Sequence, residues 1–246
     1  MRVLMLAAGR GTRISRYLSG RHKSTVDIGG EYLIKYTVEQ LKAKGITDIA
    51  ITVGYQNQEI RKILDGQGVT FYYNPFFDVT NSIASAWFAR DFIVDDEAIM
   101  IMNADVFLEP DLIDDIIAEE HSPILFADES RKEEGDYKFY YENNVLMKYG
   151  KELHGADITG EYVGVAKIGT DFISIFKEQM EHMINTQQHG VWWENILYSL
   201  VNSHDILIKE VEGKFWAEVD FIEDYERILR FRDYRLNYNI EVVHLD

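Results

Sequence analysis

The first half of the chain alternates short apolar runs with segments whose apolar residues recur every three or four positions. The apolar runs, which we expect to form buried strands, cover residues 3–8, 49–53, 69–73 and 98–102. The segments with helical spacing cover residues 33–41, 58–64 and 83–90, and Gly45 can cap the first of these helices. Strands separated by helices of this length predict right-handed crossovers and a mainly parallel sheet with helices on both faces. Such sheets bind ligands at the carboxyl ends of their strands.

Beyond about residue 123 the alternation gives way to shorter elements. Short strands are predicted over residues 124–127, 138–141, 145–149 and 162–168, with Asn143-Asn144 as a hairpin turn. Helices are predicted near residues 171–184 and 192–201, and a last long helix begins near Phe221 with Asp220 as its candidate N-cap. The chain has three prolines, no linker-like segment and no internal repeat. We therefore expect one domain over residues 1–246 that changes character near residue 123.

The composition is that of a globular protein with a strong excess of acid. Of 246 residues, 46% are hydrophobic and 27% are charged, and the formal net charge is −17 with a pI near 4.8. This charge makes nucleic acid or an anionic membrane surface a poor partner, and we expect neither. The chain has no cysteine, which excludes disulfides, thiolate zinc sites and a cysteine nucleophile. The apolar run of residues 3–8 is too short to span a membrane, so we expect a soluble, cytoplasmic protein.

The segment after the first strand, Leu6-Ala7-Ala8-Gly9-Arg10-Gly11-Thr12-Arg13, has the composition of a phosphate-binding loop. Its two glycines allow a tight turn that brings backbone N–H groups against a phosphate, and the small Ala7 and Ala8 let a base or ribose approach the main chain. An isolated Gly-x-Gly is as easily an ordinary loop, and neither a dinucleotide-binding fingerprint nor a Walker A motif is complete here. The strand before it, together with Arg13 and Lys23, favours a phosphate site. Five basic residues from Arg10 to Lys23 counter the negative charge of the chain locally.

Two aspartates far apart in the sequence are candidate metal ligands. Asp105 follows the apolar residues 99–102 and is therefore expected at the carboxyl end of a strand. Asp220 lies between the pair Phe215-Trp216 and the last helix, where the residues alone favour a helix N-cap. Magnesium prefers oxygen ligands and commonly takes one or two carboxylates together with substrate phosphates. Seven histidines lack metal-binding spacing and no G-x-S-x-G elbow occurs, so nothing indicates a covalent nucleophile.

The loop L-A-A-G-x-G-[TS]-R followed by a lysine resembles the signature of nucleotidyltransferases that make NDP-sugars and CDP-alcohols. His22 stands where the usual form has a proline before the lysine. Further matching segments are Val53-Gly54-Tyr55, Asn74-Pro75, Thr80-Asn81-Ser82-Ile83, Asn103-Ala104-Asp105 and Glu218-Val219-Asp220. The resemblance implies an α/β, Rossmann-like (GT-A-like) fold: a mixed, mainly parallel sheet flanked by helices, with a small β-rich acceptor-binding portion. Residues 1–122 would be the nucleotide-binding half and residues 123–246 the acceptor-binding half.

The resemblance also assigns roles to individual positions. Mg²⁺ would be held by Asp105 and Asp220, Lys23 would bridge the attacking group and the α-phosphate, and Arg13 would hold the β- and γ-phosphates. An oxygen of the acceptor would attack the α-phosphorus of a nucleoside triphosphate in line, with pyrophosphate leaving. The nucleotide would be bound by Leu6, Ala7, Ala8, Gly9, Gly11, Thr12, Arg13, Gly54, Asn81, Ser82 and Ala104.

A narrower resemblance concerns the acceptor. Trp193-Glu194-Asn195, followed by Glu218-Val219-Asp220, is similar to the W-[DE]-N and E-[IV]-D elements of bacterial CTP:phosphocholine and CTP:phosphonoalkylamine cytidylyltransferases. Aromatic side chains beside a glutamate could form a cage for an ammonium group, and packing of the helix against the sheet is the equal alternative. Adjacent Trp192 and Trp193 point to different helix faces, so at most one should line a pocket. We assign the acceptor to Glu161, Tyr162, Trp193 and Glu194, with Trp216 nearby.

These resemblances predict transfer of CMP from CTP to a small phosphorylated or phosphonate amino-alcohol, such as phosphocholine or 2-aminoethylphosphonate. Sugar-1-phosphate nucleotidyl transfer is the first alternative, since Glu161 followed by Tyr162-Val163-Gly164 could bind a sugar. A non-catalytic nucleotide-binding module is the second, although the joint presence of the basic and acidic site residues argues against it. Neither Asn81 nor Ser82 decides between cytosine and uracil. Phe76-Phe77 and the late aromatic residues could serve a homodimer interface.

Overall fold

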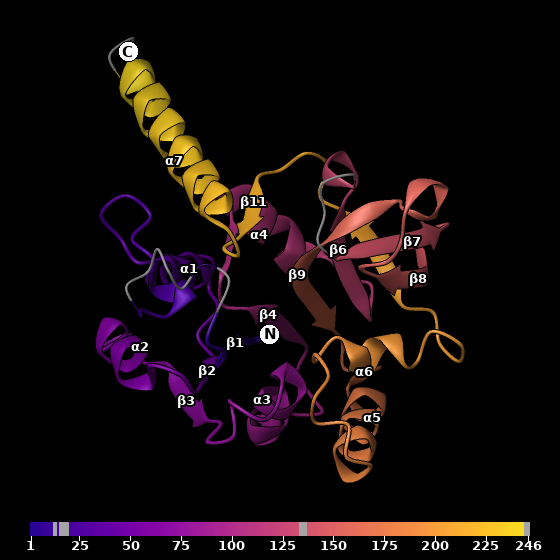
Figure 1. Ribbon diagram of the computed structural model, residues 1–246. Helices are drawn as coiled ribbons and strands as arrows, with labels where there is room; N and C mark the ends of the chain where they lie inside the picture. Colours follow the sequence, from indigo (N-terminus) through magenta and orange to yellow (C-terminus); the bar gives the residue numbers. More distant parts are fainter. Residues whose placement is uncertain (12–13, 15–19, 133–136, 244–246) are drawn as a thin grey trace.

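The computed structural model describes residues 1–11, 14, 20–132 and 137–243, with side chains up to residue 233. A nine-stranded sheet in the order β3-β2-β1-β4-β9-β6-β10-β8-β7 runs through both halves of the chain (Figure 1). Its first-half strands β1 (Arg2–Ala7), β2 (Ile49–Val53), β3 (Thr70–Tyr73) and β4 (Ile99–Asn103) pair in parallel. They are connected through α1 (Leu33–Ala43), α2 (Asn57–Ile63) and α3 (Ser82–Phe88). The predicted α/β fold is therefore confirmed, with boundaries that agree within two residues.

The second half makes the sheet mixed. The long strand β9 (Gly160–Ile168) is antiparallel to both β4 and β6 (Ile124–Asp128) and so joins the two halves. The hairpin of β7 (Lys138–Glu142) and β8 (Val145–Gly150) forms the far edge, beside β10 (Leu207–Glu210). Asn143 and Asn144 form its turn with φ angles of 52° and 62°, as the sequence predicts. Parallel pairing is thus concentrated in the first half.

Several elements differ from the sequence prediction or were missed by it. Helix α4 (Pro110–Ala118) and strands β5 (Val106–Leu108), β10 and β11 (Trp216–Glu218) were not predicted, and β5 and β11 form a separate antiparallel pair. Helix α5 covers Ile173–Asn185, and α6 covers only Asn195–Tyr198, so the predicted helix over 192–201 is too long. Helix α7 (Ile222–Val243) projects away from the body of the molecule (Figure 1). In the described part of the chain, short 3₁₀ helices cover Lys23–Thr25, Arg90–Phe92, Glu129–Arg131 and Gly155–Asp157.

The core lies on both faces of the sheet because successive strand residues point to opposite sides. In β1, Leu4 and Leu6 pack with α3, α5 and α6, whereas Val3 and Met5 pack with α1, α2 and α4. A third cluster, which includes Ile228, packs the start of α7 onto Phe107 of β5. Within the described residues, no helix combines the length and the apolar character needed to cross a membrane.

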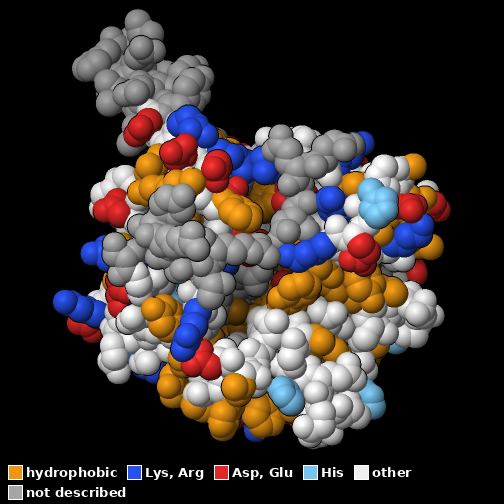
Figure 2. Space-filling model, in the orientation of Figure 1, with side chains coloured by type: hydrophobic (Ala, Val, Ile, Leu, Met, Phe, Trp, Pro, Cys, Tyr) orange, Lys and Arg blue, Asp and Glu red, His pale blue; other side chains and the backbone are white. Residues whose placement is uncertain are grey.

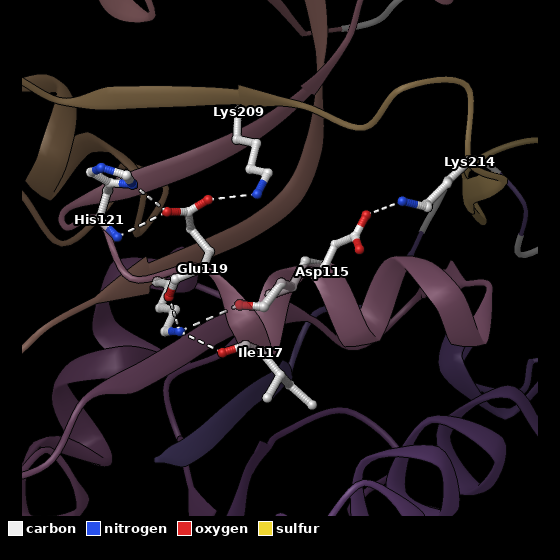
Figure 3. Close-up of polar contacts among 8 residues, drawn as sticks. Asp115, Ile117, Glu119, His121, Lys209 and Lys214 are labelled. Carbon is white, nitrogen blue, oxygen red and sulfur yellow. Dashed lines mark hydrogen bonds and ion pairs between the residues drawn. The ribbon is translucent and has the colours of Figure 1, made fainter.

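The carboxyl end of α4 is attached to the sheet by charged side chains (Figure 3). Lys167 of β9 donates to the carbonyl oxygens of Ile117, at 2.7 Å, and Glu119, which would otherwise lack partners at a helix end. The Glu119 carboxylate accepts from Lys209 of β10 at 2.6 Å and contacts His121. Burial opposes ionisation, but the hydrogen bonds from Lys209 and His121 prevail and lower the pKa of Glu119 to about 2. These contacts fix the helix that precedes β6.

Candidate active site

The loop after β1 is held by the ends of two neighbouring strands. The carbonyl oxygen of Ala8 accepts from the N–H of Tyr55 at 3.0 Å, and that of Leu6 accepts from the N–H of Ala104 at 3.1 Å. A Cβ at Gly54 would lie 2.7 Å from the Ala8 oxygen and 2.8 Å from Cβ of Phe77, so only glycine permits this approach. The loop is therefore supported by the ends of β1, β2 and β4, where Ala7, Gly54 and Ala104 lie. The side chains of Ala7 and Ala104 are buried.

Lys23 crosses the same loop and reaches a group of carboxylates. Gly11 has a φ of +59°, and a Cβ there would lie 2.9 Å from Cδ of Lys23. The ammonium of Lys23 pairs with Asp105 and, at 2.9 Å, with Asp220. Thr12 and Arg13, which the sequence assigns to phosphate binding, lie outside the described residues.

His22, which replaces the expected proline, stabilises the turn that carries Lys23. It is 2% exposed, and its Nδ1 accepts from the N–H of Ser24 at 3.1 Å and lies 2.8 Å from the Ser24 hydroxyl. Burial, aided by the charge of Lys23, lowers the pKa of His22 to about 4, so the ring is neutral at pH 7. His22 therefore fixes the turn before Lys23 through its contacts with Ser24, although it is not a proline.

Three carboxylates converge beside Lys23. The pairing of β5 with β11 places Val106 opposite Glu218, and the N–H of Val219 donates to the carbonyl oxygen of Asp105 at 3.0 Å. One carboxylate oxygen from each of Asp105, Glu218 and Asp220 lies within 4.8 Å of the other two. Glu218 was not predicted as a ligand, although it stands two residues before Asp220 in the matched motif. The prediction that Asp220 is the N-cap of the last helix is wrong: α7 begins at Ile222, so Phe221 stands at the N-cap position, where its N–H donates to Asp224 at 3.0 Å. Asp220 pairs with Lys23 instead.

The electrostatics of this group favour a divalent cation. Burial raises the pKa of Asp105 and of Glu218, and the neighbouring carboxylates raise both further. Burial alone would lower the pKa of Lys23, but Asp105, Glu218 and Asp220 outweigh it and raise the pKa. When ionised, three carboxylates and one ammonium leave a charge of −2. An all-oxygen donor set with this charge suits Mg²⁺.

A first pocket, the inner pocket, lies between the loop and the start of α3. It has a volume of about 200 Å³, and Lys23 and Asp105 stand at one side of it. Asn81 is the N-cap of α3, where its side chain accepts from the N–H of Ser82 at 2.8 Å. Of the predicted nucleotide residues, its walls include Leu6, Ala8, Gly9, Asn81 and Ser82.

A second pocket, the aromatic pocket, opens from the other side of Lys23. It has a volume of about 390 Å³ and shares Gly9, Lys23 and Glu194 with the inner pocket, so the two are continuous. Hydrophobic side chains gather on this face between α6 and the β7–β8 hairpin (Figure 2). Tyr137, Lys151, Tyr162 and Tyr198 line this pocket and not the inner one, whereas Trp192 and Glu194 line both.

Contacts within the aromatic pocket fix the orientation of these walls. The Trp192 ring stands perpendicular to Tyr137 at a centroid distance of 5.4 Å, and Tyr137 stacks on Tyr198 at 5.7 Å. Glu194 is 6% exposed, and its carboxylate accepts a long hydrogen bond of 3.4 Å from the side-chain amide of Asn103. Burial raises the pKa of Glu194 to about 7. The pocket thus combines the faces of aromatic rings with the carboxyl group of Glu194, and a cation bound beside that group would favour its ionised form.

The structure corrects the choice between the paired tryptophans. Trp193 is fully buried, its indole N–H donates to Asn103 at 3.1 Å, and its backbone N–H donates to Ser82 at 2.9 Å. Trp192 is 40% exposed and lines both pockets. As predicted, just one of the two tryptophans lines a pocket, but that residue is Trp192 and not Trp193. Because α6 begins only at Asn195, helical spacing could not indicate which side chain faces outwards.

The structure also places Glu161 and Trp216, which were predicted near the acceptor, outside the lining of the aromatic pocket. Glu161 pairs with Arg131 at 3.1 Å and lines a smaller cavity of about 70 Å³, which shares Glu218 and Asp220 with the aromatic pocket, whereas Tyr162 lines the aromatic pocket itself. Adjacent residues of β9 point to opposite faces of the sheet, so the two cannot serve one pocket. Trp216 is 3% exposed and donates to Asp128 at 2.7 Å. Glu161 and Tyr162 therefore line different cavities, while the sugar alternative stays a prediction.

Comparison with known proteins agrees with this geometry. Residues 3–162 match the family described as the MobA-like NTP transferase domain. The CTP:phosphoglutamine cytidylyltransferase of Campylobacter jejuni subsp. jejuni is 25% identical, covering 92% of this chain and 98% of that protein. The choline-phosphate cytidylyltransferase of Streptococcus pneumoniae is 23% identical, covering 93% and 96%. A solved structure of CTP:phosphocholine cytidylyltransferase from Streptococcus pneumoniae has the same fold, with a TM-score of 0.75, 20% identity and coverage of 94% and 98%.

Proposed function

We propose that this chain, which belongs to the family of MobA-like NTP transferase domains and is a nucleotidyltransferase, transfers CMP from CTP to a small phosphorylated or phosphonate acceptor that carries an amino or quaternary ammonium group. Phosphocholine and 2-aminoethylphosphonate are examples of such acceptors. One observation carries the proposal: Lys23 and the carboxylates stand where two continuous pockets meet. The inner pocket would take the nucleoside, the aromatic pocket the acceptor, and their junction the α-phosphate.

The reaction needs no residue that forms a covalent bond. An oxygen of the acceptor phosphate or phosphonate bonds to the α-phosphorus, the bond from that phosphorus to the bridging oxygen of the β-phosphate breaks, and pyrophosphate leaves. Lys23 would stabilise the negative charge that gathers on the α-phosphate. Asp105, Glu218 and Asp220 would hold Mg²⁺, which when bound neutralises phosphate charge. Lys23 would contact the phosphates from its position beside these carboxylates.

The aromatic pocket supports an amine-bearing acceptor. The faces of Trp192 and the tyrosines attract a cation, and Glu194 supplies a counter-charge at the inner end. Cytosine as the base, and a small phosphorylated acceptor that contains nitrogen, are supported by the names of these two relatives. A homodimer stays a prediction, for which Phe76 offers a 55% exposed side chain.

Pyrophosphate release tests the proposal directly. The protein is assayed with each of the four nucleoside triphosphates against phosphocholine, 2-aminoethylphosphonate and glucose 1-phosphate, with Mg²⁺ and with excess EDTA. We expect turnover with CTP and an amine-bearing acceptor that EDTA abolishes. Turnover with glucose 1-phosphate alone would instead establish the sugar alternative. Tight binding of nucleotide without turnover for any pair would favour a binding module.

A further inference from the structure

Asn103 lines both the inner pocket and the aromatic pocket, and the proposed reaction gives it no role. It ends β4, two residues after Ile101, so its side chain points to the face of the sheet that α3 and α6 cover. On that face it contacts Trp193 and Glu194, which both belong to the segment before α6. Asn103 therefore connects the strand that leads to Asp105 with a wall of the aromatic pocket.

The two contacts fix which way the amide of Asn103 is turned. The indole N–H of Trp193 can donate but not accept, so the atom that faces it at 3.1 Å is the side-chain oxygen of Asn103. The amide N–H is thereby turned to the Glu194 carboxylate, to which it donates at 3.4 Å. Trp193 is itself held in place, because its ring is fully buried and its backbone N–H donates to the Ser82 hydroxyl at 2.9 Å. A flipped amide would set an oxygen against the carboxylate and an N–H against the indole N–H.

The hydrogen bond from Asn103 matters because the carboxyl group of Glu194 is buried. Burial raises the pKa of Glu194, and the hydrogen bond from Asn103 opposes that rise. The same bond restricts rotation of the carboxylate, which lines both pockets. Without it, Glu194 would hold a proton more readily, and a neutral acid attracts a cation only weakly.

We propose that Asn103, anchored by Trp193, is a positioning residue that directs the Glu194 carboxylate at the cationic group of the acceptor, and that this contact makes the enzyme prefer such acceptors over neutral analogues of equal shape. The proposal rests on the proposed function, because it concerns acceptor binding at the same site. Asn103 takes no part in the bond changes at phosphorus. The paired tryptophans then both serve the acceptor: Trp192 lines the aromatic pocket directly, and Trp193 acts through Asn103.

Two matched pairs of acceptors isolate the positive charge. In 3,3-dimethylbutyl phosphate a carbon replaces the nitrogen of phosphocholine, and in propylphosphonate a methyl group replaces the ammonium of 2-aminoethylphosphonate. With CTP and Mg²⁺, the wild-type protein should prefer the cationic member of at least one pair by about tenfold in kcat/KM, as expected for one charge-assisted contact.

The variant Asn103→Leu keeps the size of the side chain and removes both of its hydrogen-bonding atoms. It should reduce the preference from about tenfold to about twofold, through a higher KM for the cationic member. Trp193→Phe keeps an aromatic ring but removes the N–H that anchors the amide, and should reduce the preference by about threefold. Each preference is a ratio within one protein preparation, so a loss of folded protein or of CTP affinity affects both members equally.

Asn74→Leu is the matched control. Asn74 is also a buried asparagine that lines the inner pocket, where its amide donates to the hydroxyls of Thr80 at 3.2 Å and Ser85 at 3.1 Å. In the described part of the chain, the hydrogen bonds of its side chain stay within residues 74–85, away from Trp193. Asn74→Leu should therefore destabilise the protein and raise KM for CTP without changing the preference for the cationic acceptor.

The outcomes separate this proposal from the proposed function. A preference that is unchanged in Asn103→Leu, or one that falls equally in Asn74→Leu, would overturn the role of Asn103 and leave the cytidylyltransferase intact. Equal turnover of the cationic and neutral members by the wild-type protein would overturn it too. Absence of turnover with all four acceptors would count against the proposed function itself, and with it against this role of Asn103.

Discussion

Replacing Gly11 with alanine should damage catalysis by displacing Lys23. The new Cβ would lie 2.9, 3.0 and 3.2 Å from Cδ, Cγ and Cβ of Lys23, whereas non-bonded carbon atoms prefer about 3.5–4.0 Å. The lysine chain would have to withdraw by roughly half an ångström or more. It is held at its far end by Asp105 and Asp220, so the displacement reaches the ammonium.

Two separate costs follow from this substitution. The left-handed backbone at Gly11, with a φ of +59°, costs about 1–2 kcal/mol for a non-glycine residue. In a chain of this size, each 1 kcal/mol lowers Tm by about 2–4 °C. A misplacement approaching 1 Å in a catalytic group costs up to about 100-fold in rate, so kcat should fall by about 10- to 100-fold.

Gly45→Ala separates the two costs. Gly45 has a φ of +86° with no atom within 4 Å of the added Cβ, so it carries the backbone strain without the clash. Thermal unfolding should show a similar fall in Tm for both variants, while pyrophosphate release at saturating CTP, acceptor and Mg²⁺ should fall only in Gly11→Ala. If kcat of Gly11→Ala stays within about twofold of Gly45→Ala, the lysine does not act from this position.

Three further predictions concern the acceptor wall, the carboxylates and the attachment of α4. Trp192→Ala should raise KM for the acceptor more than KM for CTP, whereas Trp193→Ala should destabilise the protein by about 3–5 kcal/mol in urea unfolding; the reverse pattern would contradict the assignment. Glu218→Gln should raise the Mg²⁺ concentration for half-maximal activity at least tenfold, and an unchanged Mg²⁺ titration would remove Glu218 from the metal site. The pKa of Glu119 is lowered from 4.5 to about 2, so its contribution to stability is full above pH 4.5 and lost as the pH falls towards 2. Glu119→Gln should therefore lower Tm at pH 7 and flatten the dependence of Tm on pH between pH 5 and pH 3. If the plots of Tm against pH for the wild-type protein and the variant are parallel, Glu119 does not contribute in this way.

Residue spacing predicted the first half of the fold well, for a physical reason. Buried parallel strands are continuous apolar runs and the helices between them are amphipathic, so both patterns are strong over residues 3–102. Strands β5 and β11 have three residues each, too few for a period to appear, and they were missed. Yet it is this pair that brings Asp105 to Glu218.

The candidate site, too, was predicted only in part. The order of motifs identified Lys23, Asp105 and Asp220, which the structure brings into contact. Side-chain direction was not predictable where it depends on the start of a short helix, as for Trp192 and Trp193, or on strand alternation, as for Glu161 and Tyr162. The position of Lys151 beside Trp192 was not predictable either, because the two residues are 41 positions apart in the sequence.

The sequence by itself determined the chemical groups available: a glycine loop that brings the backbone close to a ligand, a lysine, and carboxylates that require a cation. The tertiary structure decided which of them meet. Asp105 and Asp220 are brought together by pairing between strands more than 100 residues apart. The acceptor walls come from the residue before β7, from β9, and from α6 and the segment before it. Local spacing describes only which side of its own element a residue occupies, and long-range packing sets what that side faces.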